Sequence, residues 1–340
     1  AFSVGEHFEF AKLKKSGGKS AIITIFEAMT ASLFIFILTY LILGLDFIFS
    51  IVLAALASAT APASTMMTIR QTKAKGDYVD TLLQVVAMDD VAGLVAYSIA
   101  IAAAASMLSE SSGGGSFQVV VLPLLINLLL IVLGAAFAWL LKLMTPTRRT
   151  SDNRLIIAVA ILLLFSGVSA IFHVSPLLGC MTMGMVFANI EGHEKLFKQL
   201  NYFNPPILLL FFVRSGLTFD LNALVSSQSV GSTSLAMVGV LYFIVRLVGK
   251  YVGAFIGSAV TGKSKEVRNY LGLALAPQAG VAIGLAALAA RQLGPEVGGT
   301  LQTIILASSV LYELVGPASA KLGLYLSRSY DPQKQKETMP

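Results

Sequence analysis

Apolar stretches long enough to cross a membrane follow one another along almost the whole chain. A spanning helix needs about 20 predominantly apolar residues. By that rule the sequence contains ten candidate spans, with the approximate limits Ser20–Leu43, Phe47–Thr68, Tyr78–Leu108, Phe117–Met144, Arg154–Phe172, Val174–Ile190, Tyr202–Leu217, Ser234–Val260, Asn269–Ala290 and Thr300–Leu326. Only 12% of the residues are charged, against about 25% in soluble proteins. The sequence therefore predicts an all-α polytopic membrane protein.

The basic residues predict how these spans are oriented. Lysines and arginines gather in six clusters at alternate ends of the spans, around Lys14, Lys73, Arg149, Lys195, Lys265 and Arg328. The intervening loops at 109–116 and 220–232 contain neither. Since positive loops stay cytoplasmic, both ends of this chain are expected on the cytoplasmic side of a cell (inner) membrane. This placement accounts for the net charge of +6, so no nucleic-acid partner is predicted.

Two of the spans contain internal helix breakers. Pro62 lies in the second span and Pro277 in the ninth, and a proline inside a helix removes a backbone donor and clashes with the preceding turn. Each proline alone fits a kink that neighbouring Ser and Thr repair. Irregular backbone at membrane depth is also tolerated where it is buried in protein or lines a cavity.

The neighbours of the two breaker spans match as well. A helix precedes each of them, and a helix with an intramembrane acid follows: Asp89 and Asp90 in the third span, and Glu313 in the tenth. The topology makes these two triplets antiparallel, and inverted repeats with discontinuous helices indicate the midplane site of a secondary transporter. Helices that match the sixth and seventh spans would precede the first in a whole repeat, so we expect the sequence to lack its N-terminal helices.

Asp89 and Asp90 are the strongest candidates for chemistry. An ionisable side chain near the bilayer centre costs several kcal/mol and is kept where it faces a partner or a watery cavity. Consecutive helix positions lie about 100° apart, so the two acids cannot face one partner in the same way. One is expected to bind a cation or a proton, and the other to be held by a basic partner. A permanently ion-paired structural pair is the alternative.

Two basic residues in the eighth span supply that partner. Arg246 and Lys250 are four residues apart and therefore share a helix face. A desolvated lysine can lose its proton, whereas an arginine effectively cannot. Lys250 is therefore predicted to pair with Asp89, and Arg246 to be a fixed structural or gating charge. The alternative for Lys250 is a side chain that snorkels to the cytoplasmic interface.

Oxygen ligands for a hard cation are expected beside Pro62. Thr60 offers a hydroxyl, and an unwound backbone there would offer free carbonyls. Glu27, Gln278 and Glu313 are second-tier polar residues, because each fits an interhelical hydrogen bond equally well. The sequence has no nucleotide-binding motif and no nucleophile–base or metal set. No enzyme activity and no cofactor is predicted.

These motifs together resemble a known family. The order Thr60-Ala-Pro-Ala, then Asp89-Asp90, then Gly249-Lys250-x-x-Gly253, then a second broken helix is similar to bacterial sodium/proton antiporters. The likeness is greatest to the electrogenic, two-aspartate branch of the monovalent cation:proton antiporter superfamily, although Arg246 is similar to an arginine of the electroneutral branch. The resemblance implies that Asp90 carries the ion and the proton, that Asp89 pairs with Lys250, and that Thr60 lies near the ion.

The resemblance also implies a domain organisation. In such a fold a six-helix core moves like an elevator against a dimerisation domain, and the protein is a homodimer in the lipid bilayer. The corresponding segments are 20–108 for the first half of the core, 109–144 for a linker helix, 145–233 for the dimerisation helices, 234–327 for the second half of the core and 328–340 for a cytoplasmic tail.

The function expected from the sequence is exchange of a monovalent cation for protons, which serves pH homeostasis. The transported cation is Na⁺, with Li⁺ or K⁺ as alternatives, and cation and protons compete for Asp90 and Asp89. A potassium-efflux transporter of the same superfamily is one alternative. A sodium-coupled symporter of an organic anion is another, and it would require a wide polar cavity.

Overall fold

The computed structural model of the chain describes residues 2–6, 10–109, 116–146, 148–171, 176–190, 194–217, 229–230 and 233–330. It divides into two compact units. The first unit contains residues 1–16 and 94–218, and the second contains residues 17–93 and 219–340. The division falls inside α5, after Gly93, whereas the sequence suggested a boundary at residue 108.

The second unit contains every candidate site residue. Its helices are α2 (Phe10–Phe36), which continues as the π-helix η2 (Ile37–Ile42), α3 (Phe47–Ala57), α4 (Pro62–Thr72), the first half of α5 (Asp77–Ser109), α11 (Leu235–Val260), α12 (Lys265–Ala274), α13 (Gly280–Gln292) and α14 (Gly294–Leu326). Two short strands, β1 (Ser229–Val230) and β2 (Thr233–Ser234), pair in antiparallel fashion before α11.

Both expected helix breaks are present in this unit, and they meet. α3 ends at Ala57 and α4 begins at Pro62. Proline disfavours helical backbone in the residue before it, and Ala61 is accordingly extended. α12 ends at Ala274 and α13 begins at Gly280. The Ala61 amide donates to the Pro277 carbonyl at 2.9 Å, and the Thr65 hydroxyl donates to the Ala274 carbonyl at 3.0 Å. The two unwound segments therefore lie against each other.

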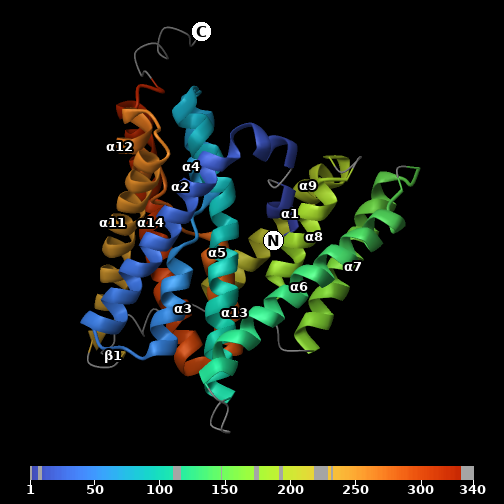
Figure 1. Cartoon of the computed structure of the whole chain (residues 1–340), viewed down its shortest axis with the longest axis horizontal. Helices are drawn as coiled ribbons and strands as arrows, with labels where there is room; N and C mark the ends of the chain where they lie inside the picture. The colour runs from blue at the N-terminus through green and yellow to red at the C-terminus, as the bar shows by residue number, and fades with distance from the viewer. Residues whose placement is uncertain are drawn as a thin grey trace. The chain divides into compact units, whose positions relative to one another are not determined.

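Helices α2 and α11 lie side by side (Figure 1), and a row of glycines allows them to pack closely. Gly249, Gly253 and Gly257 of α11 follow one another at intervals of four residues and face Ala31, Glu27 and Ile23 of α2. A Cβ atom added to Gly249 or Gly257 would lie 2.8 Å from the facing Cα atom. Only glycine allows the two backbones to approach this closely, so the row fixes how α2 and α11 align.

The first unit consists of α1 (Phe2–Gly5), the second half of α5, α6 (Ser116–Met144), α7 (Ser151–Ile171), α8 (Leu177–Ala188) and α9 (Glu194–Leu217). Buried apolar side chains hold it together, and the rings of Phe2 and Phe197 stack at 5.0 Å between centroids. Candidate site residues are absent from this unit.

Most of the predicted spans correspond to helices of the structure. Five described helices are long and apolar enough to span a membrane: Gly18–Ile42, Asp77–Ala104, Ser151–Ile171, Leu235–Val260 and Glu296–Leu326. Shorter apolar helices cover Phe47–Ala57, Leu128–Met144, Leu177–Ala188 and Gly280–Gln292. The full count of ten spans, the inverted repeat and the additional N-terminal helices stay predictions. Most of the two predicted loops, the break at Ser175 and most of the predicted tail lie outside the described residues.

Candidate ion-binding site

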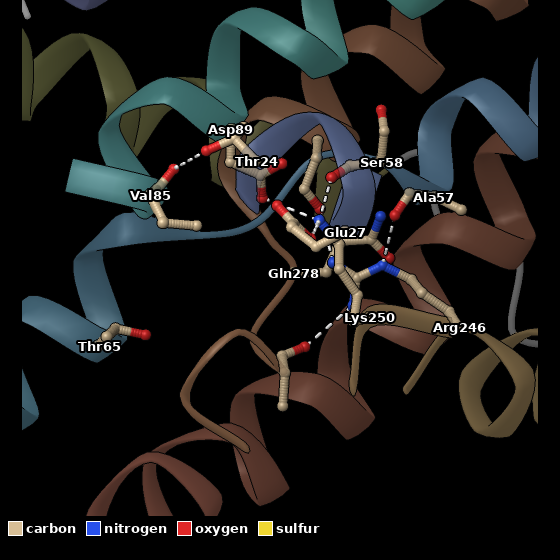
Figure 2. A network of polar contacts seen from close by, with 12 residues as sticks. Thr24, Glu27, Ala57, Ser58, Thr65, Val85, Asp89, Arg246, Lys250 and Gln278 are labelled. Carbon is tan, nitrogen blue, oxygen red and sulfur yellow. Dashed lines mark hydrogen bonds and ion pairs between the residues drawn. The ribbon is translucent and has the colours of Figure 1, made fainter. Parts of the chain in front are cut away.

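Lys250 lies at the centre of a buried cluster beside the first helix break (Figure 2). Its Nζ is 2.9 Å from Asp89 Oδ2 of α5 and 2.6 Å from Glu27 Oε2 of α2, and all three side chains have no exposed surface. The ammonium also donates to the Ser58 carbonyl in the break. Lys250 does not snorkel outward, because three helix segments supply it with acceptors inside the unit.

Arg246, one turn before Lys250, ties the two breaks together. Its Nε donates to the Ala57 carbonyl at 2.8 Å and its Nη2 to the Ala59 carbonyl at 2.6 Å, while Nη1 donates to the Ala276 carbonyl at 3.0 Å. The guanidinium lies over the Tyr312 ring, with 4.7 Å from Cζ to the ring centroid. Arg246 therefore pairs with backbone carbonyls at or next to helix ends, where partial negative charge gathers, and among the described residues it has no acid as a partner.

These contacts correct the expectation of free carbonyls at the break. The carbonyls of Ala57, Ser58 and Ala59 accept hydrogen bonds from Arg246 and Lys250. The Gln278 amide donates to the Leu56 carbonyl at 2.8 Å and contacts the Tyr242 hydroxyl at 3.0 Å. The protein's own donors thus occupy three carbonyls at the start of the break, those of residues 57–59.

Asp90 and Thr60 retain unoccupied oxygens. Asp90 Oδ1 and Thr60 Oγ1 are buried, and the described part of the chain offers neither a hydrogen-bond partner. A Cβ atom added to Gly93 would lie 3.1 Å from Ala59 Cβ, so this face of α5 lies directly against the break. Residues three apart share a helix face, which places Asp90 on the side of α5 that meets the segment containing Thr60.

The three second-tier residues have different environments in the structure. Glu27 is a direct partner of Lys250 and Gln278 is part of the buried network at the crossing. Glu313, in contrast, is exposed on α14 beside the exposed apolar side chains of Leu314 and Val315. The sequence does not single out Glu27 from the other second-tier residues, although its four-residue offset from Ile23 and Ala31 along one face of α2 is a usable signal.

The charges of this cluster determine what it can do chemically. The second unit buries three carboxyl groups, of Glu27, Asp89 and Asp90, and two cationic groups, of Lys250 and Arg246. When all five are ionised, one negative charge is in excess. A buried charge is stable only when it is paired or hydrogen-bonded, so the cluster is suited to take up positive charge, either as a monovalent cation or as protons.

Comparison with known proteins identifies the family. The family model for the sodium/hydrogen exchanger, transmembrane, matches residues 2–316. Among solved structures, the chain is similar to the sodium proton antiporter MjNhaP1 from Methanocaldococcus jannaschii, with a TM-score of 0.70 at 17% sequence identity, over 96% of this chain and 83% of that one. No curated protein sequence matches it. At this identity the structural likeness shows the fold, and the match over nearly the whole chain shows the family: the chain belongs to the sodium/hydrogen exchangers, which are membrane transporters and not enzymes.

Proposed function

We propose that this protein is an electrogenic antiporter that exchanges Na⁺ for protons across the cell membrane, with both ends of the chain in the cytoplasm. The observation that carries the proposal is the buried Asp90 carboxyl, which has an unoccupied oxygen on the α5 face that meets the break containing Thr60. The excess negative charge of the cluster supplies the affinity for a cation. The absence of a donor to these oxygens among the described residues leaves the ligand positions available.

The exchange follows from competition for the same carboxyl groups. A proton on Asp90 removes the charge that holds the cation, and a bound cation excludes the proton. When Asp89 leaves Lys250, it can also take up a proton. More than one proton is then exchanged for each cation, so net charge crosses the membrane. A carrier that crosses only when loaded with one or the other performs strict exchange.

The broken helices provide the moving element in this proposal. Hydrogen bonds from Arg246, Ala61 and Thr65 join the two breaks into one body, so the site can move as a unit. We propose that the second unit is the core that carries the site in an elevator motion, and that the helices of the first unit form the dimerisation domain of a homodimer. Such exchange would serve pH homeostasis.

Exchange in proteoliposomes tests this function. Vesicles that hold the purified protein and a pH-sensitive dye are acidified, and Na⁺, Li⁺ or K⁺ is added outside. Dequenching is expected with Na⁺ and is expected to vanish in Asp90→Asn, while Asp80→Asn, an exposed acid in the first turn of the same helix, keeps it. Unchanged exchange in Asp90→Asn would overturn the proposal. Dequenching with K⁺ alone would assign the potassium-efflux function, and currents that require an organic anion would assign the symporter.

A further inference from the structure

The exchange cycle proposed above gives Glu27 no step beyond its share of the cluster's charge, yet Glu27 makes the shorter of the two ion pairs with Lys250. Its Oε2 is 2.6 Å from Nζ, against 2.9 Å for Asp89 Oδ2. Glu27 and Lys250 are both without exposed surface. Such a pair matters for the stability of the protein, because a buried charge that loses its partner destabilises the folded state by several kcal/mol.

The Glu27–Lys250 pair joins two helices whose backbones are in direct contact. Glu27 lies in the glycine row, where a Cβ atom on Gly253 would be 2.5 Å from Glu27 Cα. The two residues of the pair therefore stand on helices in direct backbone contact, α2 and α11. Asp89 reaches the ammonium from a different helix, α5.

We propose that Glu27 is a positioning residue: it is the resident counter-ion of Lys250, which keeps the ammonium at the break and neutralised whenever Asp89 leaves it for the cation. This role rests on the proposed function. Without Glu27, release of Asp89 would leave a buried ammonium with only the Ser58 carbonyl as acceptor. Asp89 would then be bound to Lys250 more tightly and would be less available to the cation.

The test measures ²²Na⁺ binding to purified protein at one pH. Glu27→Gln is expected to raise the Kd for Na⁺ by about fivefold or more, the effect of losing one buried charged partner. In a Lys250→Gln background the same change should alter the Kd by less than about twofold, because the residue through which Glu27 acts is gone. The matched control Glu296→Gln neutralises an exposed acid at the start of α14.

Two results would overturn the inference: an unchanged Kd in Glu27→Gln, or an equal rise in both backgrounds, which would mean that Glu27 acts on the cation directly. Thermal unfolding in detergent decides the matter if Lys250→Gln binds no Na⁺. The double variant should then be more stable than Lys250→Gln, since one uncompensated acid is removed, and a less stable double variant would contradict the pairing. Wild-type vesicles that fail to exchange would refute the proposed function, whereas active wild type with a normal Glu27→Gln would refute this inference alone.

Discussion

Replacing Arg246 by alanine removes the side chain that links both helix breaks. Three buried carbonyls, of Ala57, Ala59 and Ala276, would lose their donor. Each unsatisfied buried group costs about 1–3 kcal/mol, and water that enters the vacated space would recover part of it. We expect a loss of roughly 3–5 kcal/mol in the free energy of unfolding, together with loss of exchange because the breaks no longer move as one.

Arg246→Lys separates charge from geometry. A lysine keeps the positive charge but donates from a single point, so it cannot span carbonyls of both breaks as the planar guanidinium does. Its stability should fall between those of wild type and Arg246→Ala. Thermal unfolding in detergent and dye dequenching in vesicles measure the two effects, with the exposed Arg291→Ala as control. If Arg246→Ala melts and exchanges like the control, the linkage described here is wrong.

Three further substitutions test individual contacts. Gly93→Ala places a Cβ atom 3.1 Å from Ala59 Cβ, so it should destabilise the protein by about 1–3 kcal/mol and slow exchange. Gly239→Ala has open space around the new Cβ atom and should change neither stability nor exchange. Equal melting temperatures for the two variants would contradict the close packing at Gly93. Thr60→Val removes a hydroxyl at constant shape and should raise the KM for Na⁺ by roughly three- to tenfold, with Thr60→Ser near wild type; a KM unaffected by valine would remove Thr60 from the site. Glu313→Gln should leave the Na⁺ KM unchanged, since Glu313 is exposed on α14 away from the cluster, and a raised KM would show that it belongs to the ion pathway.

The local features of the fold could be predicted from the sequence. Apolar length gave the helices, and Pro62 and Pro277 marked the two breaks, because proline acts on the backbone of its own turn. The pairing of Lys250 with Asp89 followed from the energy of burying a charge, which requires an opposite charge nearby. These inferences use one residue and its immediate chemical requirement.

The contacts across the crossing could not be predicted in the same way. The sequence does not predict that Arg246 donates to carbonyls at both breaks rather than to an acid, since a guanidinium binds either. Glu27 is one of three equivalent polar residues in the sequence, because its identity as a partner depends on how α2 and α11 align. The row of glycines sets that alignment, and the exposed position of Glu313 depends in the same way on the packing of α14.

The most direct test of the central claim is proton release on cation binding to purified protein. Na⁺ added to a weakly buffered solution of the wild-type protein should release protons, and the apparent Kd for Na⁺ should rise as the pH falls, up to about tenfold per pH unit for each proton that competes with the cation. Asp90→Asn should release none. Na⁺ binding with the same Kd at every pH and without proton release would contradict competition at Asp90.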